Sequence, residues 1–428
     1  MKKIAILGGG ITGLVSAFRL SQKGFKVEVF EKEKVLGGLA RSFNYKNYKI
    51  PISPHQFFSD DFNIINLLKE LNLKPYWGNA SIALFSAKDQ RKKVYPLLKP
   101  IDLLKLPLLS FKDRLILGIF SFRLLVDKFL KIKYDYLDKI NAKEWLIKQT
   151  NYKIYSTFFE PLLINKFAVP LEKLSAAWLA MQLRETIGKG SKSGYVEGGF
   201  HILIDRLRRE ILKRKGSIHL YSEVIMLKQK NNKIISLKYK KEGKIKEMKV
   251  DYVLSTFAPS ILANITSFPK EYSDKIKRIE YAPYIGGIMI YRKNITKEHI
   301  TYMLNSSIGA LNEFSNFYKK MPFKIMYFFK YTNINDRIWK MPKSKIKKIF
   351  ISSIKEICPN IEYDDFFVFK ERYSSPIYEK NYLQYQPKIE TPLSNLYMAG
   401  MFNIHPKMRN IDSAVFAGEK AAKIIEKI

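Results

Sequence analysis

Three glycines near the N-terminus are the first residues whose spacing indicates chemistry. Gly8, Gly10 and Gly13 follow the apolar run 4–7 in the pattern Gly-x-Gly-x-x-Gly. In a strand-turn-helix unit such glycines form a tight turn, let the backbone approach a pyrophosphate, and allow close packing of helix on strand. From about Thr12 the apolar residues take helical spacing, so the N–H groups of a helix N-terminus would face the turn. The pattern predicts an anion site for the pyrophosphate of a nucleotide.

An acidic residue completes this unit. Gly24 ends the predicted helix, residues 25–30 form a second strand, and Glu31 stands at the end of that strand. A carboxylate there can accept hydrogen bonds from both ribose hydroxyls of an adenosine. A lone glycine motif is a weak sign, but strand, turn, helix, strand and acid occur here in the required order. A signal peptide does not fit, because adjacent glycines interrupt the apolar stretch and Arg19 closes it early.

A second pair of glycines follows the predicted ribose acid. Gly37 and Gly38 precede Arg41, in the stretch VLGGLARSF. Two glycines let the backbone lie flat against a ligand, and an arginine nearby can bind phosphate. We therefore expect this segment to lie beside the same nucleotide.

The two glycine elements together resemble the flavin-containing amine oxidase, protoporphyrinogen oxidase and phytoene desaturase superfamily. Three more stretches are similar to its protoporphyrinogen-oxidase-like branch, whose substrates are mostly unassigned: 51–61 (PISPHQFFSDD), 158–168 (FFEPLLINKFA) and 194–211 (GYVEGGFHILIDRLRREI). The resemblance covers most of the chain and is weakest over 297–355. It implies FAD rather than NAD as the cofactor.

The resemblance also implies the fold and its division into domains. The expected fold is α/β, with a Rossmann-type FAD-binding domain like that of p-hydroxybenzoate hydroxylase and an inserted substrate domain of mixed sheet and helices. A chain of 428 residues is long enough for two such domains. We place the FAD-binding domain at 1–75, 192–260 and 388–428, and the substrate domain at 76–191 and 261–387.

Residues that would hold the cofactor follow from the resemblance. In the superfamily a valine at the position of Val224 lies against the adenine, and the helix after Gly400 points its N-terminus at the flavin pyrimidine. Many members carry an acid directly after this glycine, where Met401 stands here, so the resemblance implies no carboxylate contact to the ribityl chain or pyrophosphate at that point. The full predicted set is Gly8, Gly10, Ile11, Thr12, Gly13, Glu31, Lys32, Gly37, Gly38, Leu39, Ala40, Arg41, Val224, Gly400, Met401 and Ala414.

Three ionisable residues are candidates for catalysis. His55 lies in a matching segment and can orient substrate or move a proton, although an isolated histidine is as often structural. Lys166 is a candidate because amine-oxidase relatives use a lysine beside the flavin; a surface lysine is the alternative. Arg409 can stabilise a reduced anionic flavin or bind an acidic substrate. The five histidines show no metal-ligand spacing, so no metal site is predicted.

These features predict an FAD-dependent oxidoreductase. By resemblance, it would oxidise a C–N or C–C bond of an apolar or partly apolar substrate by hydride transfer to flavin N5. The alternative is a redox-neutral mutase resembling UDP-galactopyranose mutase, which would need arginines arranged for a nucleotide diphosphate. A non-catalytic FAD-containing scaffold is a third reading.

Charge and composition bear on partners and location. Lys and Arg number 75 against 39 Asp and Glu, a net charge of +36, which we attribute to compositional drift rather than to nucleic-acid binding, since no nucleic-acid module accompanies it. One cysteine, Cys358, fits a reducing compartment, so we expect a cytoplasmic protein that associates at most peripherally with anionic membrane. Within 101–137 a helix would place Leu115, Ile119, Phe122 and Val126 on one face. Burial of that face is favoured, and insertion into a membrane interface is the alternative.

Overall fold

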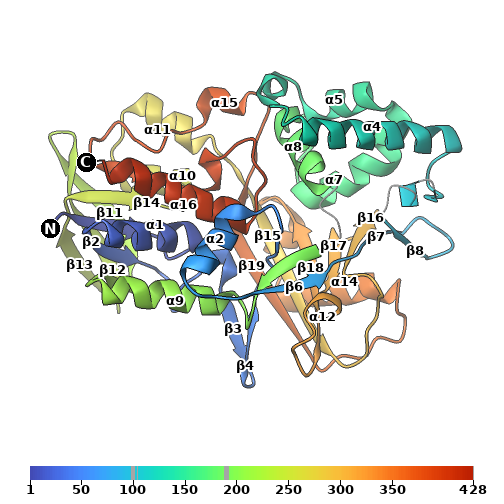
Figure 1. Cartoon of the computed structure of the whole chain (residues 1–428), viewed down its shortest axis with the longest axis horizontal. Coiled ribbons are helices and arrows are strands. Elements are labelled where there is room, and N and C mark those ends of the chain that lie inside the picture. The colour runs from blue at the N-terminus through green and yellow to red at the C-terminus, as the bar shows by residue number, and fades with distance from the viewer. Residues whose placement is uncertain (98–101, 104, 188–191, 428) are drawn as a thin grey trace.

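The computed structural model describes residues 1–97, 102–103, 105–187 and 192–427. A parallel sheet with its covering helices lies beside a larger mixed sheet, and a group of helices packs above the mixed sheet (Figure 1). The α/β architecture predicted from the sequence is confirmed.

The parallel sheet has five strands in the order β10-β2-β1-β14-β20. They span Ser217–His219, Lys26–Phe30, Lys3–Leu7, Tyr252–Ser255 and Leu396–Met398. Ile4 and Ile6 pack on one side with the helices, whereas Ala5 and Leu7 belong to the apolar cluster on the other side. Burial on both faces explains why β1 is a continuous apolar run rather than an alternating one.

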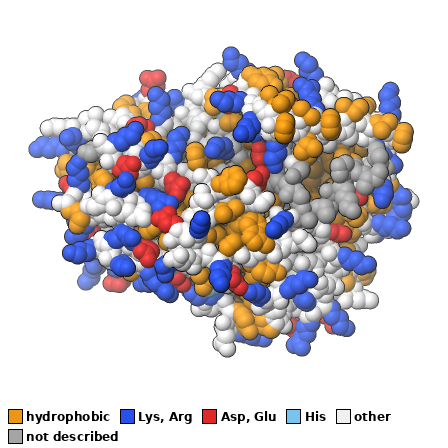
Figure 2. All heavy atoms as spheres, in the orientation of Figure 1, with side chains coloured by type: hydrophobic (Ala, Val, Ile, Leu, Met, Phe, Trp, Pro, Cys, Tyr) orange, Lys and Arg blue, Asp and Glu red, His pale blue; other side chains and the backbone are white. Residues whose placement is uncertain are grey.

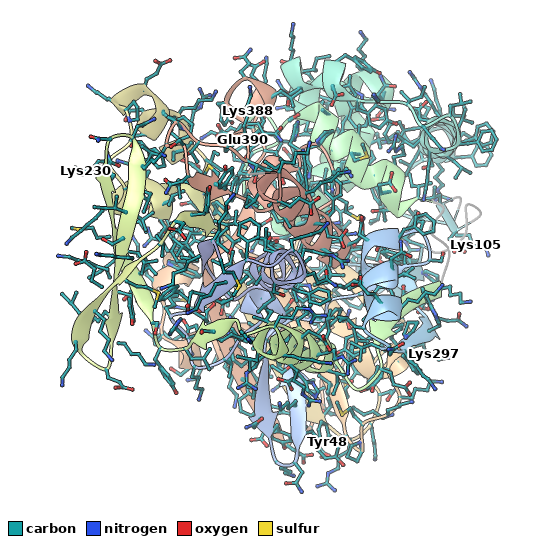
Figure 3. The ribbon with its side chains drawn as sticks, turned by 60° about the vertical axis from the view of Figure 1, so that its left-hand side comes forward. Tyr48, Lys105, Lys230, Lys297, Lys388 and Glu390 are labelled. Carbon is teal, nitrogen blue, oxygen red and sulfur yellow. The ribbon has the colours of Figure 1, made fainter. Side chains whose placement is uncertain are left out.

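Four helices cover one face of this sheet: α1 (Ile11–Gln22), α9 (Phe200–Lys213), α16 (Ile411–Ile425) and α2 (Phe62–Glu70). Figure 3 shows α1 nearly end-on, between α16 and α9. The other face carries an antiparallel meander, β11 (Glu223–Lys230), β12 (Lys233–Lys241) and β13 (Lys244–Lys249), together with α10 (Pro259–Ile265) and α11 (Lys270–Lys277).

The second sheet has seven strands in the order β19-β15-β18-β17-β16-β7-β8. Its strands are Asp365–Pro376, Tyr281–Tyr291, Lys324–Tyr331, Ala310–Glu313, Ile300–Leu304, Ile82–Ser86 and Val94–Pro96. One face packs on α14 (Lys343–Lys355) through Phe328 and Phe350, whose rings are stacked at 5.6 Å. The other face meets the parallel-sheet domain, where Phe43 contacts Phe367 and Phe369.

Smaller strands and helices join the two sheets. A hairpin, β3 (Ser42–Tyr45) and β4 (Tyr48–Pro51), carries Tyr48 near its tip (Figure 3). A three-stranded sheet pairs β5 (Phe57–Phe58), β9 (Lys192–Val196) and β6 (Pro75–Asn79). Short helices are η1 (Gly38–Ala40), α12 (Phe314–Phe317), α13 (Arg337–Lys340), α15 (Tyr382–Tyr385) and η4 (Met401–Asn403).

The helices above the mixed sheet come from one stretch of chain, which we call the helical insertion. It comprises α4 (Phe111–Phe129), η2 (Asp135–Lys139), α5 (Ala142–Gln149), α6 (Tyr152–Ile154), η3 (Tyr155–Phe159), α7 (Glu160–Phe167) and α8 (Ala176–Thr186). Among the helices the structure describes, none is long and apolar enough to cross a membrane.

Two predictions made from apolar patterns need correction. The alternation of apolar and polar residues over 217–229 predicts a single strand, but the structure has two: β10 ends before Tyr221, whose φ of 52° is left-handed, and the chain then enters a different sheet as β11. The face of α4 that was expected to be buried is exposed, with Leu115, Ile119, Phe122 and Val126 all at least 38% accessible. A different side of α4 makes the contacts with the helical insertion.

Candidate functional site

The glycine turn after β1 has the geometry that its sequence predicts. Gly8 has a φ of 108°, and a Cβ on Gly13 would lie 2.0 Å from the carbonyl oxygen of Gly8. Neither position accepts a larger residue, because one is left-handed and the other is in backbone contact. At Gly10, by contrast, no protein atom lies within 4 Å of where a Cβ would be. The space above Gly10 is therefore free for a ligand to approach the backbone.

The second glycine pair lies directly against this turn. The N–H of Gly37 donates to the carbonyl of Gly9 at 2.8 Å, and Gly10 and Gly37 form an isolated parallel bridge. Gly37 and Gly38 both have positive φ, 114° and 56°. The structure thus brings together two glycine segments that are separated by a helix and a strand.

Glu31 lies beneath the turn, with 8% of its surface accessible. Its Oε2 accepts a hydrogen bond from the N–H of Gly9 and its Oε1 one from the N–H of Glu33, both at 2.9 Å. Each carboxylate oxygen has a further lone pair with which it can accept a ribose hydroxyl. The backbone carbonyl of Glu31 accepts a hydrogen bond from the N–H of Ser222 at 2.8 Å. This bond holds the start of the segment that contains the buried Val224 close to Glu31. Lys32 is exposed beside this group.

The N-termini of α1 and α16 lie side by side. Thr12 donates from its hydroxyl to the carbonyl of Ala414 at 3.0 Å, and one turn later Ser16 donates to Gly418 at the same distance. Contacts that advance in the same direction along both helices show that the helices run parallel. Their positive dipole ends, at Ile11 and at the Asn410 cap, therefore face the same region. Two parallel helix N-termini form a strong binding site for a pyrophosphate.

These residues fit a dinucleotide. The open space at Gly10, the paired helix N-termini and the acceptor carboxylate of Glu31 match the pyrophosphate and ribose of such a ligand. Sequence segments around residues 10, 31 and 411 supply these groups, and the fold places all three at the end of one sheet.

The segment after β20 is held by polar contacts of its own. The N–H of Gly400 donates to Oδ1 of Asn403 at 3.0 Å, and the hydroxyl of Tyr378 donates to the carbonyl of Met401. The Met401 side chain is half-buried and supplies no carboxylate at this point.

Arg41 has a protein partner. Its guanidinium forms an ion pair with Glu371 of β19 and donates to the carbonyl of Gly38 at 2.9 Å. The pair links the second glycine segment to the mixed sheet. Because Glu371 balances its charge, Arg41 supports the segment formed by Gly38, Leu39 and Ala40.

His55 also contacts this segment. Its Nε2 lies 3.1 Å from the carbonyl oxygen of Leu39, so Nε2 carries the hydrogen. Burial lowers the pKa of His55 from its ordinary value, and the bond to Leu39 opposes that shift without reversing it. The imidazole is therefore neutral, with Nδ1 as an acceptor.

Arg409 and Lys166 come together at one aromatic ring. The guanidinium carbon of Arg409 is 5.6 Å from the centre of the Phe167 ring, and Nζ of Lys166 is 5.8 Å from it. Arg409 is closer still to Trp178, at 4.3 Å, and donates to the carbonyl of Pro376 at 2.7 Å. Among the described residues no carboxylate lies within ion-pair distance of Arg409. Burial lowers the pKa of this guanidinium from its ordinary value.

Within the described part of the chain, His55 makes no hydrogen bond or ring contact with Lys166 or Arg409; its partners are Leu39 and the Phe200 ring. Lys166 lies instead over the Tyr302 ring, at 5.3 Å, which places it between α7 and the mixed sheet. The three predicted catalytic residues therefore separate into a histidine on the second glycine segment and a cationic pair at Phe167.

The aromatic stretches 284–291 and 324–331 indicate strands that would line a substrate cavity, but nothing in the sequence places their side chains beside Arg409. The rings that meet there form what we call the Arg409 aromatic cluster: Phe167, Trp178, Tyr378, Tyr331, Tyr284 and Phe329. Tyr284 packs against the rings of Tyr331 and Phe329. Tyr331 is close enough to Arg409 for an electrostatic interaction between the two side chains. These rings come from α7, α8, β15, β18 and the chain after β19. Only the pairing of distant strands brings them together, so no local signal could have found them.

The described structure has a cavity next to the Arg409 aromatic cluster and another within the helical insertion. One of about 380 Å³ is lined by Tyr331, Lys330, Glu160 and Ile164, next to the Arg409 aromatic cluster. A larger one, about 590 Å³, lies between α4 and α5 and is lined by Phe120 and Trp145. No residue of the glycine segments lines the larger cavity, so its size does not make it the nucleotide site.

Comparison with known proteins agrees with this geometry. The profile of the family described as flavin containing amine oxidoreductase matches residues 11–425. An L-amino-acid oxidase from Crotalus adamanteus is 21% identical over 303 residues, which are 68% of this chain and 57% of the oxidase. The chain thus spans little more than half the length of that relative.

Solved structures share the fold across the whole chain. A wild-type putrescine oxidase bound to putrescine has a TM-score of 0.80 at 14% identity, covering 100% of this chain and 99% of the oxidase. Reduced UDP-galactopyranose mutase has a TM-score of 0.77 at 17% identity, covering 99% and 95%. At these identities the likeness establishes the fold alone. With the family profile extending over nearly all of its length and a site that fits a flavin dinucleotide, the chain belongs to the flavin-containing amine oxidoreductase family.

Proposed function

We propose that this protein oxidises a substrate with an apolar body and one acidic group, at a C–N bond or at an allylic C–C bond. The observation that carries this proposal is the setting of Arg409. The Arg409 guanidinium lies among aromatic side chains and has no carboxylate partner in the described residues. Because an unpaired buried charge is unfavourable, this site should bind an anionic group of the substrate.

The aromatic residues define the rest of the substrate. Trp178 and Tyr378 are buried, and Tyr284 and Tyr331 form a further pair of rings 5.7 Å apart. Such side chains favour a flat or unsaturated apolar group and exclude water from it. Tetrapyrroles, polyene acids and aromatic amino acids combine an apolar body with a carboxylate.

The residues around the substrate have different roles in the reaction. Arg409 binds the acid group and so fixes the orientation of the substrate. The Arg409 aromatic cluster excludes water from the reacting carbon. His55 and Arg41 hold the segment 38–40 in place from two sides. FAD, when bound, supplies the hydride acceptor at N5. Dioxygen, a quinone or another acceptor then has to reoxidise the flavin.

The names of two relatives support oxidation at carbon next to nitrogen. One is an L-amino-acid oxidase and another is a putrescine oxidase. The Arg409 site favours the former kind of substrate, which carries a carboxylate, over a diamine. We therefore place amino acids with large apolar side chains, together with tetrapyrroles and polyene acids, first among the substrates to test.

A redox-neutral mutase is the second candidate, because reduced UDP-galactopyranose mutase shares the fold. A nucleotide diphosphate calls for more than one cation at the substrate. Phe167 brings Lys166 near Arg409, so two cations lie at this ring, although the described residues place no second arginine there. The aromatic side chains around Arg409 favour an apolar body over a sugar nucleotide, and thus the oxidase.

The test is anaerobic reduction of the purified, FAD-loaded protein. An acid-bearing apolar substrate should bleach the flavin absorbance, whereas the methyl ester of the same compound should bleach it at least about tenfold more slowly at equal, subsaturating concentration. A mutase would show no bleaching by these compounds, and would act on a sugar nucleotide only after reduction with dithionite. Equal bleaching by acid and ester would contradict the role of Arg409.

A further inference from the structure

Helix α4 has apolar side chains on two opposite sides. Leu117, Phe120 and Leu124 form the inner side and are buried against the rest of the helical insertion. Phe120 contacts Trp145 and Phe159 at 5.6 and 6.0 Å between ring centres. These residues suffice to attach the helix to the fold, so a second apolar side is not needed for packing.

The second side forms a continuous exposed stripe, which we call the outer stripe. Its residues recur at helical spacing along the whole of α4 and point to solvent: Phe111 68% accessible, Leu115 45%, Ile119 71%, Phe122 67%, Val126 38% and Phe129 86%. At 1.5 Å per residue it is about 27 Å long. Figure 2 shows hydrophobic side chains gathered over the helical insertion, with Lys and Arg beside them. Exposed apolar surface of this extent marks an interaction site.

Basic residues border the outer stripe on both sides. At 100° per residue, Lys112 and Arg123 fall along one edge and Arg114 along the other, and Lys131 follows the end of the helix. Lys128 lies nearer the buried side, where it is paired with Asp60 at 3.2 Å and Glu185 at 3.9 Å. Arg123 donates to the uncharged amide of Gln149.

The acids of α4 lie away from the stripe. Asp113 is buried and accepts hydrogen bonds from Ser110 and Asn151, and Asp127 accepts from the buried Tyr134. The exposed side of the helix is therefore apolar in the middle and positive at its margins.

We propose that α4 docks the protein onto an anionic lipid membrane, with the outer stripe in the interface and the basic margins at the headgroups. Large side chains projecting from a convex helix would need a matching groove in a protein partner, whereas a lipid interface adapts to them. Anionic headgroups complement the margins, and the net charge of +36 adds long-range attraction. A symmetric pair of copies meeting through the stripe would instead bring lysine and arginine margins together. This proposal does not rest on the identity of the substrate.

The test is co-sedimentation of the FAD-loaded full chain with vesicles. The wild type should bind vesicles that contain phosphatidylglycerol at least about tenfold more tightly than vesicles of phosphatidylcholine alone. The double variant I119D/F122D should lose at least about tenfold in binding to the anionic vesicles. Since both side chains point to solvent, its FAD content and melting temperature should equal those of the wild type.

A matched control comes from the antiparallel meander. Ile235 and Ile245 are exposed, 46% and 65%, and the variant I235D/I245D adds the same two charges far from α4 in the sequence. It should bind vesicles almost as well as the wild type. A single substitution, F122W, should also give fluorescence that brominated lipids quench, beyond the quenching seen with the wild type.

Three results would overturn the proposal. Equal binding by I119D/F122D and I235D/I245D would mean that surface charge alone attracts the protein. Loss of all binding in high salt without any quenching at F122W would mean that the stripe does not enter the lipid. A dimer that forms without vesicles and is abolished by I119D/F122D, with no vesicle binding by the wild type, would assign the stripe to a second copy of the chain.

Discussion

The guanidinium carbon of Arg409 lies 4.3 Å from the centre of the Trp178 indole ring, with Nη1 donating to the carbonyl of Pro376. Arg409 lies just before helix α16, which packs on α1, and Trp178 belongs to α8 of the helical insertion. The contact therefore joins the helical insertion to the part of the chain that packs on the parallel sheet.

Replacing Arg409 should affect substrate binding more than turnover. In R409Q the KM for an acid-bearing substrate should rise about 10- to 100-fold, with kcat much less changed. This rise corresponds to the loss of one charge-assisted hydrogen bond of about 1.5–3 kcal/mol. The KM for the methyl ester should not rise. Steady-state kinetics on both compounds checks this, with FAD absorbance as the measure of folding. A fall in kcat for both compounds at constant KM would instead place Arg409 at the flavin.

A pair of variants can distinguish two roles of His55: the hydrogen bond to Leu39 and proton transfer by the imidazole. In H55Q the amide can still donate to the carbonyl of Leu39, whereas H55A leaves that carbonyl without its donor. We expect H55A to lose about 1–2 kcal/mol of unfolding free energy and to bind FAD less tightly, and H55Q to lose little of either.

Kinetics then decides whether the imidazole also transfers a proton. If His55 only positions Leu39, H55Q retains both the rate and the pH profile of the wild type. A large loss of rate in H55Q with intact FAD binding would show that the imidazole itself is needed.

Asp138 stabilises the junction between the helical insertion and the C-terminal segment. Its carboxylate accepts hydrogen bonds from His405 at 2.9 Å, Ser175 at 2.8 Å and the N–H of Leu383 at 2.9 Å. Burial alone would raise the pKa of Asp138, but these donors, His405 first, lower it below its ordinary value. D138A should therefore cost about 3 kcal/mol of unfolding free energy, whereas D135A, at an exposed position of the same turn, should cost little.

The contribution of Asp138 depends on pH in a defined direction. Because its folded-state pKa is depressed, the stabilisation is fully present above the unfolded-state value of about 3.9 and is lost as pH falls through the folded-state value. Chemical denaturation across the acid range should show the gap between wild type and D138A closing below about pH 4. A gap that stays constant down to pH 2 would contradict the assignment.

The sequence predicted those parts of the site that local backbone geometry determines. Gly8, Gly13 and Gly37 each fill a position where a side chain would be strained or would clash, so their spacing alone carries the information. Strands β1 and β2 and helix α1 were likewise confirmed, because each has a single buried pattern.

Long-range packing set the limits of prediction. Periodicity showed that α4 has an apolar face through Leu115 and Ile119 but could not tell which of its two apolar sides is buried. Nor could it show that Glu371 neutralises Arg41 or that Trp178 lies over Arg409, since these pairs join elements far apart in the chain. The break at Tyr221 depends on one left-handed residue that alternation does not reveal.

The central claim is that a flavin dinucleotide fills the open space above Gly10, and one pair of variants tests it most directly. Gly10 has an ordinary φ of −73°, and neither it nor Gly118 of α4 has an atom of a more distant residue within 4 Å of the Cβ position, so the protein alone has room for a Cβ at both. FAD titration of the apoproteins should give G10V a Kd at least about 100-fold above the wild type, at an unchanged apoprotein melting temperature, because the valine occupies the space of the pyrophosphate. G118V should bind FAD like the wild type. Equal FAD affinity in G10V and G118V would contradict the account.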